Sequence, residues 1–299
     1  MFKSFDAKAL SPAQLQNWLQ SAIAPRPIAF ASTQDAAGNI NLSPFSFFNV
    51  FGTNPPIIIF SPARRIRDNT TKHTLQNVQQ VPEVVIHIGN YPLVEQMSLA
   101  STEYPAGVNE FIKAGLTPIP AVLVKPPRVQ EAPVAFECRV MEVKSIGDQN
   151  GAANLVICEV LMLHIHEAIL NTAGTAIDPL KLQPVARLGG DWYGQSTAES
   201  LFRLPKPNNN LGMGFDQLPP GIRQNIFLDS SNLARLANLE KLPTYFELQN
   251  IRQEPYVQYL LQKYAPDPAA QYTAMSKLAK KLILLNQPEK ALQILLTLL

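Results

Sequence analysis

The chain has 299 residues, with 25 Lys and Arg against 23 Asp and Glu, so its formal net charge is +2. Hydrophobic residues make up 46% and charged residues 16%, a composition that excludes an intrinsically disordered chain. The near balance of charge excludes a global attraction to nucleic acid. This length predicts one large domain, or one domain with an extension.

Cysteine usage and hydropathy indicate where the protein works. Two cysteines, Cys138 and Cys158, cannot form a disulfide framework, and we expect both to be unreactive core residues. The first 20 residues lack the apolar core of a signal peptide. The sequence contains no run of about 18 apolar residues, so it predicts no membrane-spanning helix. We therefore expect a soluble cytoplasmic protein with no membrane or nucleic-acid partner.

The first predicted element is a helix. Ser11 is a good N-cap, and Pro12 suits the first helical position. Apolar residues then recur at helical spacing and form one stripe: Leu15, Trp18, Leu19 and Ala22.

Short β-like runs dominate the chain after this helix. They cover residues 28–33, 40–42, 57–60, 83–88, 134–140, 154–166 and 185–188. Turn sequences at 35–39 and 147–151 predict two hairpins, and alternation places Glu137 and Arg139 on a wet face at the start of the second.

Helical spacing returns between two of these strands, at residues 91–101, where Leu93, Met97 and Ala100 align. Six or so strands with two intervening helices do not fit a βαβ repeat. They favour a mainly β fold with peripheral helices, a closed or nearly closed antiparallel barrel.

The sequence pattern changes near residue 204, from β-like runs to helical spacing. Residues 205–210, rich in Pro and Asn, predict a linker. Helical patterns follow at 231–239, 255–264, 269–285 and 288–299, and the last two predict an αα-hairpin. Its two apolar stripes are Met275, Leu278, Leu282 and Leu285, and Leu292, Leu295, Leu296 and Leu299. We expect a barrel domain over 1–204 and a helical extension over 205–299.

Two segments are candidates for ligand binding. Residues 61–74 hold three Arg, one Lys, three Thr and one Ser directly after a buried strand, with a formal charge of +3. Cationic side chains, hydroxyls and a following helix N-terminus suit a phosphate dianion, although a solvated loop is the alternative. Residues 41–51 interleave small polar residues with four Phe, which suits the edge of a flat heterocycle or an ordinary core strand and turn.

An ordered set of motifs resembles the flavin reductase-like, FMN-binding split-barrel family over roughly residues 20–204. The motifs include Pro25-Arg26-Pro27-Ile28-Ala29, Asn41-Leu42-Ser43-Pro44-Phe45-Ser46-Phe47-Phe48-Asn49, and Lys72-His73-Thr74-x-x-Asn77. The resemblance implies FMN bound noncovalently at the interface of a homodimer. By position, it implies isoalloxazine contacts from Ser43, Pro44, Phe45, Ser46, Phe47, Phe48 and Asn49. It implies ribityl and phosphate contacts from Ser61, Arg64, Lys72, His73 and Thr74.

The sequence departs from the family pattern at two places. His73 stands where the family usually has Asp, and an imidazole can itself donate to phosphate. Gly151-Ala152-Ala153-Asn154 stands where many reductases carry Gly-Asp-His, whose His helps to form the nicotinamide site. The second departure leaves FMN binding in place and weakens the case for NAD(P)H as co-substrate.

Other groups of potentially functional residues give weaker evidence for a site. His164 and His166 share one face of a strand, but no third ligand accompanies them, so a polar strand end is favoured over a metal site. No catalytic side chain is assigned, because a flavin reductase works by placing the nicotinamide near flavin N5.

Three functions therefore remain open. The first is an NAD(P)H-dependent FMN oxidoreductase with a small-molecule electron acceptor. The second is an FMN enzyme that acts directly on an organic substrate, and the third is a flavin-binding or interaction protein without catalysis. We expect the extension to pack on the barrel or across the dimer and to provide stability or partner binding. The competing hypothesis is a lid that places Phe215 or Tyr245 over the flavin.

Overall fold

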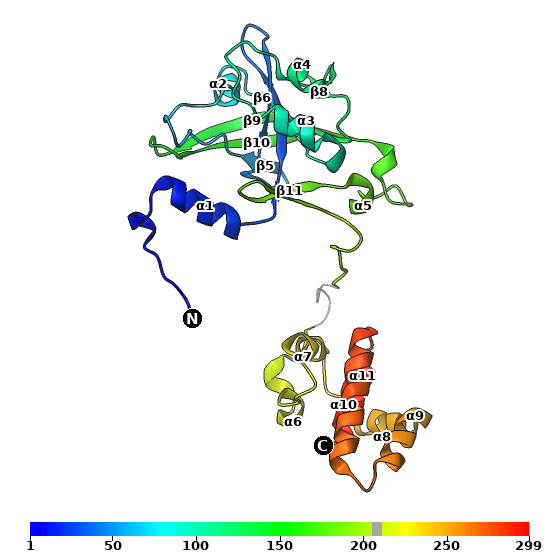
Figure 1. Cartoon of the computed structure of the whole chain (residues 1–299). Helices are drawn as coiled ribbons and strands as arrows, with labels where there is room; N and C mark the ends of the chain where they lie inside the picture. Colours follow the sequence, from blue (N-terminus) through cyan, green and yellow to red (C-terminus); the bar gives the residue numbers. More distant parts are fainter. Residues whose placement is uncertain (205–210, 299) are drawn as a thin grey trace. The chain divides into compact units, whose positions relative to one another are not determined.

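The computed structural model describes residues 1–204 and 211–298 (Figure 1). The chain divides into two compact units, Met1–Phe202 and Arg203–Leu299. The first unit is built mainly from strands, and the regular elements in the described part of the second unit are all helices. The predicted linker at 205–210 lies outside the described residues.

A seven-stranded antiparallel sheet forms the first unit, in the order β3-β2-β6-β9-β10-β5-β4. Its strands in chain order are β2 (Ala29–Gln34), β3 (Ile40–Phe45), β4 (Phe48–Thr53), β5 (Pro56–Phe60), β6 (Glu83–Ile88), β9 (Val134–Ile146) and β10 (Ala153–Ile165). Both predicted hairpins are present, since β2 pairs with β3 and β9 with β10.

The strand order explains why the sheet curls into a barrel. Strands β3 and β4 stand at opposite ends of the order, yet Ser46 and Phe47 alone connect them. The sheet must therefore bend until its two edges approach each other, and the barrel stays split where they meet. The inward face packs a core that includes Ala31, Phe45 and Phe60.

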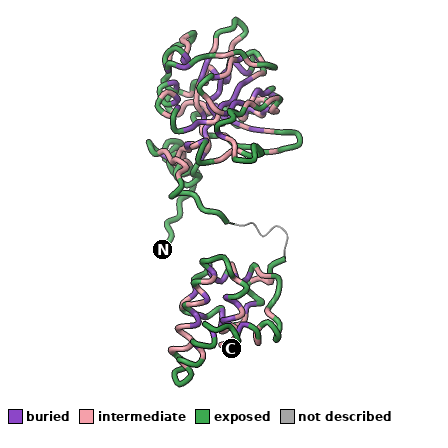
Figure 2. Tube along the Cα trace, turned by 90° about the vertical axis from the view of Figure 1, so that its right-hand side faces the viewer, coloured by how far each residue is buried: buried purple, intermediate pink, exposed green. Residues whose placement is uncertain are grey.

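The outer face of the same sheet is covered by short helices. Residues Leu93, Met97 and Phe111, from η2 (Tyr91–Leu93), α3 (Val94–Leu99) and α4 (Glu110–Ala114), pack against Phe30 and Leu42. Strand β2 is thus buried on both faces. Figure 2 shows the buried residues of this unit gathered in its interior.

Smaller elements complete the unit. A second sheet has the order β1-β11-β12, and a third pairs β7 with β8. The strands of these two sheets are β1 (Arg26–Pro27), β7 (Pro118–Ile119), β8 (Arg128–Val129), β11 (Val185–Gly189) and β12 (Trp192–Gln195). The remaining helices of the unit are η1 (Ala7–Ala9), α1 (Pro12–Ala22), α2 (His73–Gln80), η3 (Glu167–Ile169) and α5 (Pro179–Leu182).

The helical unit has its own hydrophobic core, which includes Leu236, Met275, Ile283 and Leu292. Its elements are η4 (Phe215–Gln217), α6 (Pro220–Arg223), α7 (Ser230–Ala237), α8 (Tyr245–Gln253), α9 (Pro255–Lys263), α10 (Pro268–Leu284) and α11 (Pro288–Leu296). Helices α10 and α11 form the expected hairpin. The buried face of α10 centres on Met275, Ala279 and Ile283, whereas Leu285 is exposed.

One expectation about exposure is wrong. Glu137 was expected on a wet face of β9, but it is fully buried, because its carboxylate accepts bonds from the Val122 and Leu123 backbone N–H groups at 2.8 and 2.6 Å. The apolar stripe of α1 is not covered in the single chain, where Trp18 and Leu19 are exposed.

With this correction, the predicted fold class is confirmed: a mainly β split barrel with peripheral helices and a helical C-terminal extension. Within the described part of the chain, no helix has both the length and the apolar character needed to cross a membrane.

Candidate functional site

The split in the barrel brings the two predicted ligand-binding segments together. Strands β3 and β4 are the terminal strands of the sheet, so their outward backbone groups have no strand partner. The connection at Ser46 and Phe47 lies between these two free edges, and the Ser61 backbone N–H donates to the Phe47 carbonyl at 2.8 Å. The cationic loop 61–74 thus starts directly beside the Phe-rich segment.

A small cationic hollow lies at the N-terminus of α2. Arg65, Lys72 and His73 line it with Ser43 and Thr74, while two carboxylates, Glu103 and Glu110, complete its charged lining. It has a volume of only about 20 Å³. The N-cap position of α2 makes no side-chain capping bond, unlike α1, α7 and α8, which have full capping boxes. A helix start with free backbone N–H groups and adjacent cations attracts anions.

Lys72 is the central cation of this hollow. Burial and then the neighbouring Arg65 lower the pKa of its ammonium group. Its Nζ lies 5.3 Å from the centre of the Phe45 ring, and no carboxylate in the described part of the chain lies within ion-pair distance of it. A largely buried cation without a counter-ion favours an anionic ligand.

Glu103 closes the hollow from the opposite side. Its carboxylate pairs with Arg65 at 2.9 Å and also with Arg67. Arg65 further donates to the Thr70 hydroxyl and the Thr71 carbonyl. The ion pairs hold the loop at 100–104 against the cationic loop, which accounts for the small volume.

A buried polar network fixes the geometry of the hollow. The Thr74 hydroxyl donates to Asn41 Oδ1 at 2.8 Å, and the Asn41 amide donates to Glu110 at 2.8 Å. Glu110, itself buried, also accepts from the Leu42 backbone N–H. The network joins α2, β3 and α4, so the side chains of the hollow are positioned by three elements.

The predicted site residues do not all line this hollow. The Arg64 guanidinium turns into its own loop and donates to Asn69 Oδ1 at 2.7 Å and to the Asn69 carbonyl at 2.8 Å. Ser61 is buried, and its hydroxyl accepts from the Asn154 backbone N–H at 3.2 Å. Arg65 and Glu103, which the sequence argument did not single out, line the hollow instead.

The turn between β9 and β10 braces the cationic loop. The Asn150 side chain donates to the Ile66 carbonyl at 2.6 Å, and the Asn154 side chain donates to the Pro62 carbonyl at 3.1 Å. The Arg64 backbone N–H donates to the Ala152 carbonyl at 2.9 Å. The residues that depart from the family pattern at 151–154 therefore hold the loop that carries Lys72.

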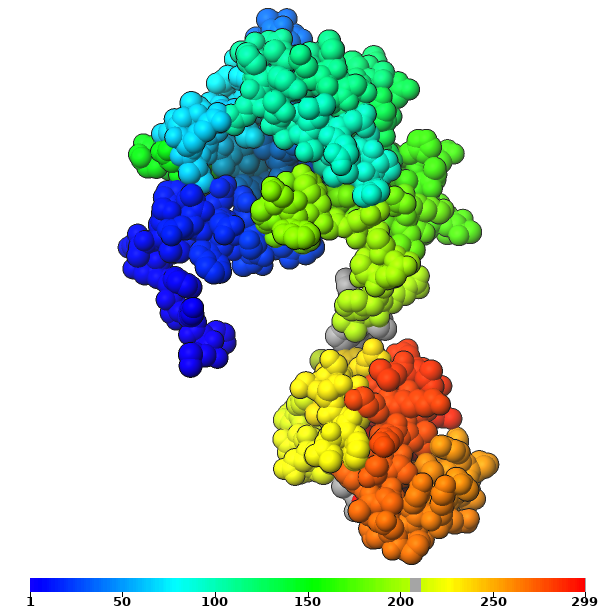
Figure 3. All heavy atoms as spheres, in the orientation of Figure 1, coloured from blue at the N-terminus to red at the C-terminus, as the bar shows by residue number. Residues whose placement is uncertain are grey.

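A second hollow, of about 150 Å³, lies farther along β3. Pro44, Phe45 and Ser46 form one wall, and Arg26, Arg187 and Tyr193 line the rest together with Gln20, Ile28, Met97 and Ser101. It shares Ser101 with the cationic hollow. Figure 3 shows the surface of this unit recessed between its blue, cyan and yellow-green segments.

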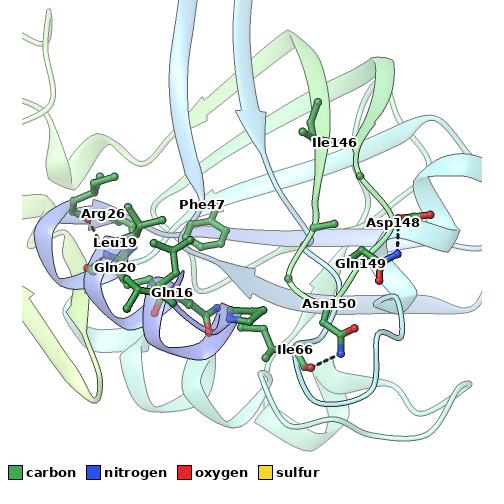
Figure 4. Close-up of a pocket in the computed structure, with 17 residues that line it drawn as sticks. Gln16, Leu19, Gln20, Arg26, Phe47, Ile66, Ile146, Asp148, Gln149 and Asn150 are labelled. Atoms are coloured by element: carbon green, nitrogen blue, oxygen red, sulfur yellow. Dashed lines mark hydrogen bonds between the residues drawn. The ribbon is translucent and has the colours of Figure 1, made fainter. Parts of the chain in front are cut away.

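A third hollow, of about 550 Å³, opens beside α1 (Figure 4). Its walls are mostly apolar and include Leu19, Phe47 and Ile66, with the β9–β10 turn on the far side. Gln20 and Arg26 border both this hollow and the second one. The second hollow therefore adjoins each of the other two.

The remaining candidates from the sequence have structural roles. His164 Nε2 lies 2.7 Å from Glu137 Oε1, and His166 Nδ1 accepts from the Ala168 backbone N–H. Among the described residues no group of three or more His, Cys, Asp or Glu could hold a metal ion. Cys138 and Cys158 are fully buried, and burial raises the pKa of both thiols, that of Cys158 to about 12.

The fold and these hollows define a split-barrel protein with polar and apolar hollows near its split. A model of the flavin reductase like domain matches residues 21–180. An uncharacterized protein of Halalkalibacterium halodurans is 36% identical over 201 residues, which are 67% of this chain and 94% of the relative. Another from Aquifex aeolicus is 37% identical over 61% of this chain and 90% of its own length.

Solved structures agree with these matches. Nitrilotriacetate monooxygenase component B from Bacillus cereus superposes with a TM-score of 0.63 and 28% identity, over 68% of this chain and all but 1% of its own. A putative flavin reductase with a split barrel domain from Shewanella frigidimarina gives 0.58 and 26%, over 69% and 100%. The chain belongs to the flavin reductase-like split-barrel family, a family of flavin-related oxidoreductases.

Proposed function

We propose that the protein is an FMN-dependent oxidoreductase that holds the flavin along the split of its barrel. The observation that supports this most is Lys72, a largely buried cation with no carboxylate partner among the described residues, beside the uncapped start of α2. The cations and backbone N–H groups at this hollow suit a phosphate dianion, which FMN carries and riboflavin lacks, and release of Arg65 from Glu103 would make room for it.

The neighbouring residues suit the rest of the flavin. Backbone groups of Ser43–Asn49 lie on the free edges of β3 and β4, where a flat polar heterocycle can accept and donate hydrogen bonds. Lys72 and His73, with the Thr74 backbone N–H at the start of α2, would hold the phosphate, and Arg65 would join them on release from Glu103. Arg64, Ser61 and the Thr74 hydroxyl would act through the loop shape, since their polar atoms bond within the protein.

Bound FMN would supply the redox chemistry, accepting a hydride at N5 and passing the electrons on. The protein would then contribute orientation and exclusion of water. The large hollow beside α1 borders Phe47 and is wide enough at about 550 Å³ for a nicotinamide or another flat donor. We therefore propose NAD(P)H as the electron donor.

Anaerobic reduction tests this proposal. The FMN-loaded protein should lose its flavin absorbance band within minutes of adding NADH or NADPH. This band lies at about 450 nm in flavoproteins generally. Dithionite serves as the control that the bound flavin is reducible. Bleaching by dithionite and by neither nicotinamide would leave FMN binding in place and remove NAD(P)H from the function.

One observation favours a second function, an FMN enzyme that takes electrons directly from an organic substrate. The wall of the large hollow formed by residues 146–152 contains no imidazole. The backbone and side-chain N–H groups of Asn154 instead donate hydrogen bonds to the cationic loop. A substrate would then fill the apolar space where the family resemblance places a nicotinamide. Reduction of the flavin by a small organic donor, and not by NAD(P)H, would identify this function.

We further propose a homodimer. Large apolar side chains are exposed on α1, β4 and β10 of the single chain: Trp18, Leu19, Val50, Phe51, Leu161 and Leu163. Exposed apolar side chains on these elements would be covered by a two-fold partner, which would bury the same elements on both copies.

A further inference from the structure

Two arginines face each other beside the proposed flavin site. Arg26 on β1 and Arg187 on β11 are directly opposite in the antiparallel register. Opposed residues in such a pair have Cα atoms about 4.5–5.5 Å apart, and like charges placed there repel. A folded protein normally relieves this repulsion with a carboxylate.

No carboxylate does so here. Among the residues that the structure describes, none forms an ion pair with either arginine. Arg26 donates to the carbonyls of Gln20 and Ile23 at the end of α1. Arg187 donates to the Tyr193 hydroxyl at 2.8 Å and lies over the Tyr193 ring at 4.5 Å. Two full positive charges thus meet neutral acceptors alone.

Burial makes the arrangement costly. Arg26 is only 6% exposed, and its Nη2 atom has no hydrogen-bond partner within the described chain. Burial and then the charge of Arg187 lower the pKa of the Arg26 guanidinium. An unpaired, partly unsatisfied guanidinium in this position destabilises the protein unless something else binds it. Such local costs are typical of binding sites.

The hollow that both arginines line shows what could bind. Its volume of about 150 Å³ admits a small organic molecule, and Pro44, Phe45 and Met97 give it apolar walls, while Ser46 adds a hydroxyl. It shares Gln20 and Arg26 with the large hollow and Ser101 with the cationic hollow. A molecule held here would lie next to the proposed flavin.

We propose that Arg26 and Arg187 bind the carboxylate of a small, partly apolar organic acid, the co-substrate of the flavin. The planar guanidinium fork matches a carboxylate, and the apolar walls take the body of the molecule. The role as co-substrate rests on the proposed function, but binding of the acid does not require the flavin. Phosphate has related chemistry, and the flavin phosphate is the other source of an oxyanion in this region.

Calorimetric titration of the flavin-free full chain with benzoate tests the site. Benzamide, which has nearly the same shape and no charge, is the matched ligand. We expect saturable binding of benzoate in the millimolar range or tighter, and at least tenfold weaker binding of benzamide. Benzamide binding as tightly as benzoate, or no saturable benzoate binding in that range, would overturn the proposal.

Variants locate the acid at the arginine pair. Arg187→Gln should weaken benzoate at least tenfold, while its melting temperature without benzoate should stay equal or rise, because the repulsion with Arg26 is relieved. Arg187→Lys keeps the charge without the fork and should bind with intermediate affinity. The control is Arg128→Gln, on β8, whose side chain donates to the Pro120 carbonyl away from this hollow. Unchanged benzoate affinity in Arg187→Gln would overturn the proposal.

Titrations with FMN and riboflavin distinguish a site for an organic carboxylate from a site for the flavin phosphate. Arg187→Gln should keep the preference for FMN over riboflavin that wild type shows. Loss of that preference in Arg187→Gln, with retention in Lys72→Gln, would mean that the arginines hold the flavin phosphate, and the proposal would be wrong. If benzoate binds as expected and FMN does not bind at all, the acid site stands and the proposed flavin function fails.

Discussion

His87 is a fully buried imidazole whose two hydrogen bonds define its tautomer. The Val129 backbone N–H lies 2.9 Å from Nε2, which must accept, so Nδ1 carries the proton and donates to the Phe30 carbonyl at 2.9 Å. Burial lowers the pKa of His87 from 6.5 to about 4. The ring therefore stays neutral and joins β6 to β2 and β8 at ordinary pH.

This shift predicts a loss of stability in acid. Between pH 6.5 and 4 the unfolded chain binds a proton at His87 that the folded chain does not, so the free energy of unfolding falls as the pH is lowered through this window. At about 1.4 kcal/mol per pKa unit the loss from this residue is up to about 3 kcal/mol. Urea titrations of wild type and His87→Gln from pH 7 to 4 measure it. Parallel pH profiles for the two proteins would contradict the prediction.

Glu103 competes with the proposed flavin phosphate for Arg65. Glu103→Gln removes the negative charge over the cationic hollow and should tighten FMN binding about fivefold, which corresponds to roughly 1 kcal/mol. The readout is quenching of FMN fluorescence. Glu95→Gln, an acid in the first turn of α3, is the control and should leave the affinity unchanged. Weaker FMN binding in Glu103→Gln would show that the carboxylate helps to form the site.

At the residue scale, the sequence showed the charge of the loop at 61–74 but not its individual contacts. The cluster of cations at 61–74 was evident, but nothing in the order Arg64-Arg65 says which guanidinium faces the hollow. The choice depends on Asn69, which has a positive φ of 59° and binds Arg64. The burial of Glu137 was equally hidden, because its donors at 122 and 123 come from a distant loop.

Among the elements, β4 carries apolar side chains that a single chain leaves exposed. Val50 is 61% exposed and Phe51 65%. If β4 lies in the proposed dimer interface, Val50→Asp should convert the dimer to a monomer, because a carboxylate would be buried there without a partner. Light scattering at micromolar concentration gives the mass. Ile112→Asp, at an exposed apolar residue of α4, should leave the dimer intact, and a monomer in wild type would refute the prediction.

Elements with a strong period were predictable and short ones were not. Strands β6 and β10 follow clear β-rich runs, and their observed bounds lie within one residue of the predicted ones, whereas β9 extends six residues beyond its predicted end, to Ile146. Strand β4 was not recognised as separate from β3, since Ser46 and Phe47 carry no turn signal. Helix α8 was missed because its burial depends on packing against α9 and α11, which a local pattern does not contain.

For the whole molecule, the two units have separate hydrophobic cores. The Halalkalibacterium protein is matched over 94% of its own length, so the rest of it is too short to form a unit like the helical one. Deleting residues 205–299 should therefore leave a folded barrel whose FMN affinity is within about twofold of wild type, well under 1 kcal/mol. Fluorescence titration measures this affinity. A large loss of affinity in a folded, dimeric barrel would instead support a lid that includes Phe215 or Tyr245.

The most direct test of the flavin site is a parallel titration of the flavin-free full chain with FMN and with riboflavin. The account predicts one FMN per chain, bound at least tenfold more tightly than riboflavin, a difference of about 1.4 kcal/mol or more from the phosphate. In Lys72→Gln this preference should largely disappear, while riboflavin binding stays unchanged. Equal binding of FMN and riboflavin by wild type, or no binding of either, would contradict the assignment of the cationic hollow to the flavin phosphate.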